Sequence, residues 1–220
     1  MENNDKHNIS YEYISRYIGG VLEQSTGLLR ELELYAEKNN IPIAPLETIR
    51  FIQTLLLATQ PKRILEVGAA IGYSAITMAK CGGNITTIER DKKMAELLKQ
   101  NIEKAGLLKR ITVLKGDAAD ILPTLTEQFD FIFLDAAKGH YIDFLPDCIR
   151  LLKDGGLLCS DNVLYKGMVA TDELVIRRKI TIVRRLRSYL KTLCENDRLT
   201  TSVIPIGDGL ALSCKGREQK

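Results

Sequence analysis

The stretch Lys62-Arg-Ile-Leu-Glu-Val-Gly-Ala-Ala-Ile-Gly-Tyr-Ser74 decides the fold of this chain. Residues 64–67 form the short, mostly apolar run that is expected of a buried parallel strand. Gly68 ends this strand, and Gly72 precedes a helical pattern. Glycines at a strand-to-helix turn let the backbone approach a ligand closely, because they carry no Cβ. The first turn of the following helix offers free N–H groups, so the stretch predicts a ligand site.

An acidic residue, Glu89, ends the next predicted strand at 84–89. An acid at this place can accept hydrogen bonds from both hydroxyls of a ribose. The turn at 68–72 lacks the third glycine of the dinucleotide-binding pattern, and nothing in it requires a pyrophosphate. Two glycines alone are a weak signal, but together with Glu89 they favour a nucleoside ligand without phosphates.

Short apolar runs alternate with helical patterns from residue 63 onward. Strands are predicted at 63–67, 84–89, 111–114, 129–134 and 156–160, with helices near 73–80, 91–105, 118–122 and 142–152. This alternation is typical of βαβ units and predicts an α/β fold with a doubly wound, mostly parallel sheet. Helical patterns within 1–40 and at 46–59 add extra N-terminal helices.

The length and composition favour one structural domain in the cytoplasm. At 220 residues the chain is long enough for one sizeable core, with a helical cap at 1–40 and the sheet domain at 41–220. We find no signal-peptide pattern and no apolar run long enough to cross a membrane. The five scattered cysteines indicate reduced thiols, without a disulfide framework or a zinc site.

Polar residues follow the predicted strands at the edge where parallel sheets bind ligands. Four of the five strand ends carry an acid within a residue: Glu89, Asp117, Asp135 and Asp161. These acids could also be ordinary helix N-caps, and for Asp117 that alternative is a serious one.

Two of these strand ends could form a metal site. If the strands before Asp135 and Asp161 are neighbours, these carboxylates and the amide oxygen of Asn162 share one pocket. Three hard oxygen ligands suit Mg²⁺. They suit zinc poorly, because no His or Cys lies beside them in the sequence.

Several motifs resemble a known enzyme family. Glu66-Val-Gly-Ala-Ala-Ile-Gly-Tyr-Ser74 and Thr86-Thr-Ile-Glu89 resemble the S-adenosylmethionine (SAM) binding core of Rossmann-like class I methyltransferases. The Gly-Tyr-Ser ending, Asp135-Ala-Ala-Lys138 and Asp161-Asn-Val-Leu164 resemble the cation-dependent O-methyltransferases that include the catechol and caffeoyl-CoA enzymes. The resemblance extends from about Ile41 to the end of the chain.

The resemblance implies a role for individual residues. The cofactor SAM would contact Ile41, Glu66, Gly68, Gly72, Ser74, Glu89, Asp117, Ala118 and Asp135. Mg²⁺ or another divalent cation would be bound by Asp135, Asp161 and Asn162. Lys138 would act with Asp135 in catalysis as the general base, because partial burial near a cation favours the neutral form of an amine. Most lysines are simply solvated, and His140 has no assigned role. Members of the family usually form homodimers, so we expect one here.

Residues 172–195 bear on the choice of acceptor. A chelated acceptor needs two adjacent oxygens, as in catechols, caffeoyl groups and 5-hydroxyuridine. The segment holds seven basic and three acidic residues. On a helix, Arg177, Arg184 and Lys191 would form a stripe flanked by Arg178 and Arg185. The opposite, apolar face would consist of Val175, Leu186, Leu190 and Leu193. Such a stripe is expected of phosphate-backbone binding, although it could be an ordinary solvated face.

Three further segments resemble bacterial tRNA 5-hydroxyuridine methyltransferases: 160–167, the Arg177-Arg-Lys-x-Thr181 run and 200–209. This resemblance implies Mg²⁺-dependent O-methyl transfer from SAM to 5-hydroxyuridine at the tRNA wobble position, giving 5-methoxyuridine. The RNA-binding candidates are then Arg177, Arg178, Arg184 and Arg185. One alternative is an O-methyltransferase of a small catechol or caffeoyl-type phenol. The third alternative is a protein that binds SAM without catalysing methyl transfer. The presence of Asp135, Lys138, Asp161 and Asn162 argues against this alternative.

Overall fold

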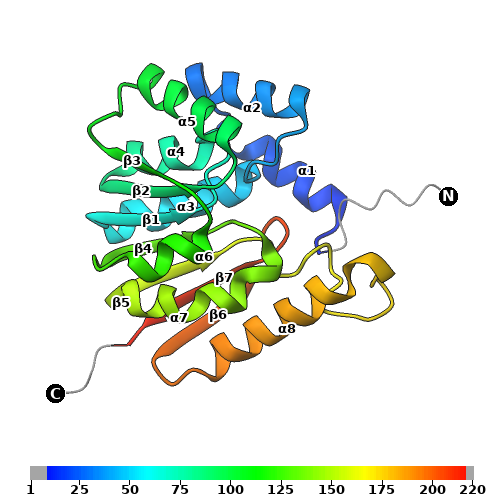
Figure 1. The fold of residues 1–220 in the computed structure, drawn as a ribbon. Coiled ribbons are helices and arrows are strands. Elements are labelled where there is room, and N and C mark those ends of the chain that lie inside the picture. The colour runs from blue at the N-terminus through cyan, green and yellow to red at the C-terminus, as the bar shows by residue number, and fades with distance from the viewer. Residues whose placement is uncertain (1–8, 217–220) are drawn as a thin grey trace.

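The chain folds around a seven-stranded sheet in the computed structural model, which describes residues 9–216 (Figure 1). The strand order is β3-β2-β1-β4-β5-β7-β6. The strands are β1 (Arg63–Val67), β2 (Asn84–Glu89), β3 (Ile111–Lys115), β4 (Phe129–Leu134), β5 (Leu152–Ser160), β6 (Leu199–Ile204) and β7 (Leu210–Lys215). The first five are parallel, whereas β7 is antiparallel to both β5 and β6. The prediction of a doubly wound, mostly parallel α/β sheet is confirmed.

The predicted strands differ from the observed ones mainly at the end of the chain. Strands β1, β2 and β4 have the predicted bounds, and β3 is one residue longer. Strand β5 begins at Leu152, because the chain continues in the sheet through Gly155, whose φ is 78°. The antiparallel strands β6 and β7 were not predicted.

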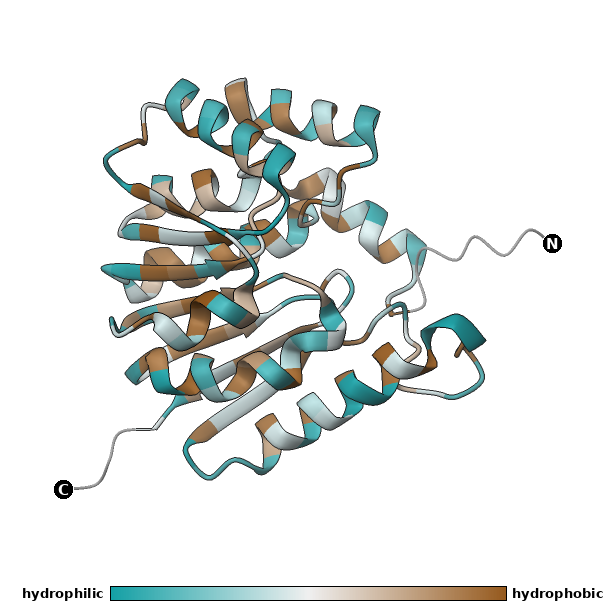
Figure 2. Cartoon of the chain, viewed as in Figure 1, coloured by the Kyte–Doolittle hydropathy of each residue, from teal (hydrophilic) through white to brown (hydrophobic). Residues whose placement is uncertain are grey.

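Alternating side chains of the strands build two hydrophobic cores, one on each face of the sheet. Ile64 and Phe131 belong to one core, and their neighbours Leu65 and Ile132 belong to the other. The strands therefore read as continuous apolar runs, because both faces are covered by helices. Figure 2 shows this contrast between hydrophobic strands and partly hydrophilic helices.

The helices divide between the two faces. The first core includes residues of α2 (Gly27–Asn39), α3 (Leu46–Thr59), α4 (Tyr73–Cys81) and α5 (Lys92–Lys104). The second core includes residues of α6 (Ala118–Ile121), α7 (Tyr141–Leu151) and α8 (Ile180–Glu195). Three short 3-10 helices are η1 (Leu122–Thr124), η2 (Lys138–His140) and η3 (Arg177–Lys179). The helical layers on both faces leave the carboxyl ends of the parallel strands as one edge of the molecule (Figure 1).

The N-terminal cap predicted at 1–40 consists of α1 (Glu12–Val21) and α2, while residues 1–8 lie outside the described part of the chain. Helix α1 has no buried residue. Helix α2 buries Leu32 and Ala36 in the first core. The Tyr73 hydroxyl also donates a hydrogen bond to Glu33 Oε1 at 2.7 Å. These contacts attach α2 to the sheet domain.

The basic segment is only partly the helix that its sequence suggests. Helix α8 begins at Ile180, so Arg177 and Arg178 lie in η3, before the helix. On α8, Leu186 and Leu193 are buried as predicted, whereas Val175 lies outside the helix. The prediction that Arg177, Arg184 and Lys191 form one stripe along a single helix was therefore wrong for Arg177, which precedes α8. Figure 2 shows the strongly hydrophilic segment at the start of α8.

Within residues 9–216, none of the helices is both long and apolar enough to span a membrane. All five cysteines are unpaired.

Candidate active site

A cavity of about 670 Å³ opens at the carboxyl ends of the parallel strands. Most of the predicted site residues line it: Ile41, Gly68, Ser74, Glu89, Asp117, Ala118, Asp135, Lys138, Asp161 and Asn162. Glu66 and Gly72 are not among the lining residues. The strand-end rule for ligand sites therefore predicted the position of the cavity and part of its wall.

The turn after β1 brings the backbone very close to the neighbouring strand end. Gly68 has a φ of 97°, in the left-handed region that favours glycine. A Cβ at this position would collide with the carbonyl oxygen of Asp135. Only glycine therefore allows the turn and Asp135 to form a shared wall of the cavity.

Glu89 organises the turn with both of its carboxylate oxygens. The backbone N–H of Ala70 donates to Oε2 at 2.8 Å, and that of Asp91 donates to Oε1 at 2.8 Å. The residue is 9% exposed and lines the cavity. Each carboxylate oxygen can accept more than one hydrogen bond, so Glu89 can hold the loop and still receive a ligand hydroxyl.

Glu66 and Gly72 have structural surroundings. Glu66 is fully buried and accepts hydrogen bonds from the hydroxyls of Ser74 and Thr87, each at 2.5 Å. Burial raises the pKa of Glu66 to about 7, although these two hydrogen bonds oppose the shift. Gly72 has a φ of 91°, and a Cβ there would lie 2.5 Å from the side chain of Leu98. Both residues support the turn from behind the cavity wall.

Asp117 combines the two roles that its position suggests. Its carboxylate accepts a hydrogen bond from the N–H of Ala119 at 2.9 Å and so caps α6. The same residue lines the cavity, with Arg90 at 3.8 Å. The N-cap alternative is thus correct for Asp117 and does not exclude a ligand contact.

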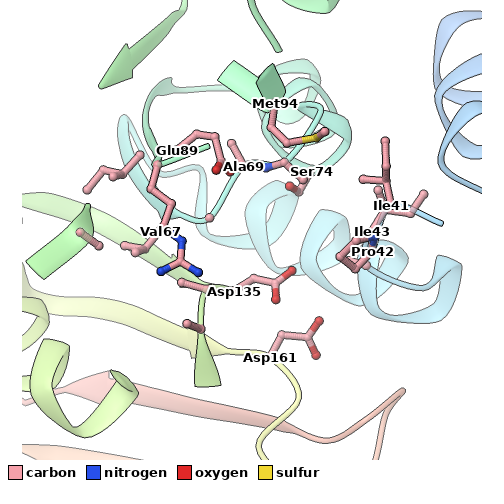
Figure 3. A pocket seen from close by; sticks show the side chains of 18 of the residues that line it. Ile41, Pro42, Ile43, Val67, Ala69, Ser74, Glu89, Met94, Asp135 and Asp161 are labelled. Atoms are coloured by element: carbon pink, nitrogen blue, oxygen red, sulfur yellow. Dashed lines mark hydrogen bonds between the residues drawn. The ribbon is translucent and has the colours of Figure 1, made fainter. Parts of the chain in front are cut away.

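The two acidic strand ends lie side by side. Leu134 pairs with Ser160, the last residue of β5, so Asp135 and Asp161 directly follow paired positions. The buried hydroxyl of Tyr141 lies 3.1 Å from the carbonyl oxygens of both Leu134 and Asp161, and it can tie the two strand ends together. Figure 3 shows both carboxylates pointing to the same side, with Ile41, Pro42 and Ile43 across the cavity.

Asp161 has the strongest sign of a missing partner. It is 1% exposed, and its Oδ1 accepts the N–H of Asn162 at 2.7 Å. Its Oδ2 is buried, and no group within residues 9–216 forms a hydrogen bond with it. Burial, followed by the charge of Asp135, raises the pKa of Asp161 to about 8. A divalent cation would satisfy Oδ2 and remove the repulsion between the two acids.

The donor set indicates which cation fits. Within residues 9–216, no three His, Cys, Asp or Glu residues gather into a metal-binding group. The donors available are therefore the carboxylates of Asp135 and Asp161 with the amide of Asn162, which also lines the cavity. This set of oxygen ligands fits Mg²⁺ or a similar hard cation, with positions left for water or a ligand.

Lys138 lies within reach of the same place. Its Nζ donates to Asp135 Oδ1 at 2.7 Å, and the two side chains are 24% and 20% exposed. His140, by contrast, is exposed and lies 3.2 Å from the carboxylate of Asp143. Lys138 is therefore the basic side chain that the structure places beside the two acids.

Sequence reasoning missed several parts of the site. Asn39, Asn40, residues 42–45, Tyr73 and Met94 also line the cavity. Asp208, in the β6–β7 connection, interacts electrostatically with Lys138 and Asp161. Its Gly-Asp-Gly setting was a visible signal of a tight turn, but the missing prediction of β6 and β7 left the turn without a place.

The four candidate arginines differ in their surroundings. Arg177, Arg178 and Arg184 are exposed, and within the described part of the chain none of them makes an ion pair. Arg185 instead donates to the carbonyl oxygen of Gly139 and pairs with Asp143. Three of the four RNA-binding candidates are thus free to contact a partner, and Arg185 is engaged in the fold.

A comparison with protein families decides the assignment. A family model described as O-methyltransferase matches residues 22–216. The chain belongs to this O-methyltransferase family. Together with O-methyltransferase relatives and structures, the match makes it a SAM-dependent O-methyltransferase.

Individual relatives cover most of this O-methyltransferase. It is 33% identical to a catechol O-methyltransferase of Niastella koreensis, over 94% of this chain and 98% of the relative. It is 33% identical to a caffeoyl-CoA O-methyltransferase of Populus kitakamiensis, over 76% of each chain. A solved O-methyltransferase from Streptomyces achromogenes, involved in tomaymycin synthesis and in complex with SAM, has a TM-score of 0.82. Its identity is 25%, with 99% of this chain and 100% of that chain covered.

Proposed function

We propose that this enzyme transfers the methyl group of SAM to a hydroxyl that has a second oxygen beside it, with Mg²⁺ or a similar divalent cation. The observation that carries the proposal is the buried, unpartnered Oδ2 of Asp161 next to Asp135. Two adjacent acceptor oxygens can occupy the ligand positions that three protein donors leave open. A divalent cation supplies Lewis acidity for the acceptor oxygen, and SAM supplies an electrophilic methyl group.

The protein's own residues position the reactants. Glu89 and the turn at 68–72 form the end of the cavity suited to the ribose of SAM, and Asp135, Asp161 and Asn162 hold the acceptor end. Because both ends open into one cavity, the donor and acceptor groups can be held face to face. Lys138 Nζ, beside Asp135, would take the proton from the acceptor hydroxyl.

A small catechol or caffeoyl-type phenol is the first candidate acceptor. The curated relatives at 33% identity are a catechol and a caffeoyl-CoA O-methyltransferase. Both acceptor types carry two adjacent oxygens on an aromatic ring. The names of the relatives favour this acceptor over a nucleic acid.

A 5-hydroxyuridine at the wobble position of tRNA is the second candidate, which would give 5-methoxyuridine. Its hydroxyl lies beside a ring carbonyl, so it meets the same chelation requirement. The specific observation in its favour is the group of exposed arginines, Arg177, Arg178 and Arg184. Exposed arginines on one segment are suited to phosphate groups.

The two acceptors can be separated with one triple variant. The triple variant carries Gln in place of Arg177, Arg178 and Arg184. The matched control carries Gln in place of three exposed lysines, Lys99, Lys104 and Lys109. Methylated products from a catechol, caffeoyl-CoA and tRNA that carries 5-hydroxyuridine are identified by mass spectrometry, and tRNA affinity is measured across a salt series.

For a tRNA enzyme, the arginine variant loses tRNA methylation, and its salt slope becomes shallower by roughly 0.9 for each phosphate that is no longer neutralised. The lysine control keeps the wild-type slope. For a small-phenol enzyme, both variants methylate the catechol or caffeoyl-CoA at the wild-type rate. Absence of transfer to any acceptor with adjacent oxygens would contradict the proposed function itself.

A further inference from the structure

The turn after β5 contains an unusual run of backbone conformations. Asn162, Tyr165 and Lys166 have φ values of 58°, 46° and 57°, all in the left-handed region. Side chains other than glycine rarely adopt this region, because the Cβ crowds the backbone. The turn must therefore be held by its surroundings. Its first residue is Asn162, which lines the cavity beside Asp161.

The β6–β7 connection supplies this support. The N–H of Val163 donates to the carbonyl oxygen of Gly209 at 3.0 Å, and that of Leu164 donates to the carbonyl oxygen of Asp208 at 3.1 Å. Gly209 has a φ of 86°, and a Cβ there would collide with the side chain of Leu164. The two segments are therefore in close contact, at a distance that only glycine at 209 permits.

The side chain of Asp208 adds the contact nearest to the end of the turn. Its Oδ1 accepts a hydrogen bond from the backbone N–H of Lys166. The carboxylate is half-buried and close enough to interact electrostatically with Lys138 and Asp161. One residue thus contacts the turn through its backbone carbonyl and its side chain, on the side of the two acidic strand ends.

We propose that Asp208 is a positioning residue for methyl transfer, which holds the turn at 162–166 so that Asn162 stays in place beside Asp161. The inference rests on the proposed function, in which Asp161 and Asn162 bind a divalent cation. Asp208 need not touch the cation or the substrate itself. Replacing a residue that orients metal ligands commonly weakens metal binding by about 10- to 100-fold.

The test uses Asp208→Ala and Asp208→Asn in the full chain. Asn keeps an oxygen that can accept the Lys166 N–H, whereas Ala does not. The matched control is Asp130→Ala, at the opposite end of β4, where the carboxylate accepts the N–H groups of Lys62 and Arg63 at 3.0 and 2.8 Å. Binding of Mn²⁺ alone is followed by its electron paramagnetic resonance signal, SAM binding by calorimetry, and folding by thermal unfolding.

We expect Asp208→Ala to weaken Mn²⁺ binding by about tenfold or more, with SAM affinity unchanged. Asp208→Asn should restore most of the Mn²⁺ affinity, and Asp130→Ala should leave it at the wild-type value. Wild-type Mn²⁺ affinity in Asp208→Ala would overturn the inference and leave the proposed function standing. Asp161→Asn, which alters a proposed cation ligand, serves as the reference for weak Mn²⁺ binding. If Asp208→Ala fails to fold, an equally weak Mn²⁺ affinity in Asp208→Asn would also overturn the inference. Absence of Mn²⁺ binding by the wild type would overturn both.

Discussion

At the scale of single residues, the site depends on side chains that are costly to bury alone. Asp161 is buried with one oxygen unpartnered, and Glu66 is fully buried with two hydroxyl donors. Burial raises the pKa of both carboxyls, because the charged form loses its hydration. The two groups differ in what compensates them. Glu66 is satisfied by hydroxyl groups of the protein, whereas Asp161 keeps one oxygen that the proposed cation would satisfy.

The role of Lys138 as a base can be tested with two substitutions. Lys138→Met removes both the charge and the proton acceptor, and we expect kcat to fall by roughly 10²- to 10⁴-fold. Lys138→Arg keeps a positive charge that can pair with Asp135 but does not release its proton near neutral pH. It should be almost as inactive as Lys138→Met.

The measurement is the steady-state rate, with SAM affinity determined separately by calorimetry. Both variants should bind SAM as the wild type does. Near-normal turnover in Lys138→Arg would show that Lys138 acts through its charge and is not the base.

The buried Glu66 predicts a pH dependence of stability. Its pKa is raised from 4.5 to about 7 in the folded protein, so folding favours the protonated form. Its stabilising contribution is complete below about pH 4.5 and is lost as the pH rises through about 7. Across this window the free energy of unfolding should fall by up to about 1.4 kcal/mol per pH unit from this group alone.

Glu66→Gln removes the titration while keeping an acceptor for one hydroxyl. Urea unfolding of both proteins between pH 4 and 8, without added metal, measures the difference. Parallel stability curves for wild type and Glu66→Gln would contradict the assignment.

The sequence indicated which residues lie near the site, but not which of them line the cavity and which support its wall from behind. Strand-end position placed Asp135 and Asp161 at one edge of the sheet, because parallel strands end there. Their closeness also required neighbouring strands, which the pairing of β4 with β5 provides. It could not show that Glu66 points behind the wall, since burial depends on which face of β1 each side chain occupies. Nor could it show Asp208, whose place depends on a distant strand pairing.

At the scale of secondary-structure elements, α8 supports the segment η2. Arg185 on α8 donates to the carbonyl oxygen of Gly139 and pairs with Asp143. Gly139 immediately follows Lys138, so this contact holds the segment that carries the proposed base. The adjacent Arg184 is exposed and makes no such contact within residues 9–216.

This difference predicts unequal effects of substituting the two neighbouring arginines. Arg185→Gln should destabilise the fold by about 1 kcal/mol, because the charged hydrogen bonds that it removes are partly solvent-exposed. It should also lower kcat by loosening η2. Arg184→Gln should change neither quantity. Thermal unfolding and turnover of the two variants provide the check, and equal behaviour of both would contradict this role for Arg185.

The elements that were predicted correctly share a simple physical pattern. Strands β1, β2 and β4 are largely buried, so β1 and β4 read as short, mostly apolar runs and β2 as a run of β-branched residues. Strands β6 and β7 lie toward the sheet edge and are mixed in character. In β7, Lys215 is only 4% exposed because its amine donates to the carbonyl oxygens of Ile149 and Leu152, at 3.0 and 2.6 Å. The neighbouring residues in the sequence do not predict that Lys215 is buried in a strand.

At the scale of the whole molecule, α1 is an element that the fold leaves uncovered. Tyr17 and Val21 on this helix are 72% and 63% exposed, and Tyr11 at its N-cap is 70% exposed. Contiguous exposed apolar side chains commonly mark contact surfaces. Together with the homodimers expected from the family resemblance, this leads us to propose that α1 contributes to a contact between two copies of the chain.

A double substitution tests this proposal. Tyr17→Ser with Val21→Ser should shift the protein toward the monomer by removing apolar contact area, without affecting the core, since α1 has no buried residue. Size-exclusion chromatography with light scattering gives the mass of wild type and variant. A wild-type protein that is monomeric at micromolar concentration would rule out the dimer.

The helical layers and the mixed sheet place the cavity at the ends of the parallel strands. We propose that a cation bound there by Asp135, Asp161 and Asn162 is needed for methyl transfer. The most direct test is the initial rate of methyl transfer from labelled SAM by metal-stripped enzyme, measured against added Mg²⁺. The acceptors are a catechol, caffeoyl-CoA and tRNA that carries 5-hydroxyuridine. Each is compared with an analogue that lacks one of the two adjacent oxygens. We expect no transfer in chelator, and recovery with Mg²⁺ only for acceptors that have both oxygens. A full rate in chelator, or equal rates with the analogue, would contradict a cation-dependent mechanism.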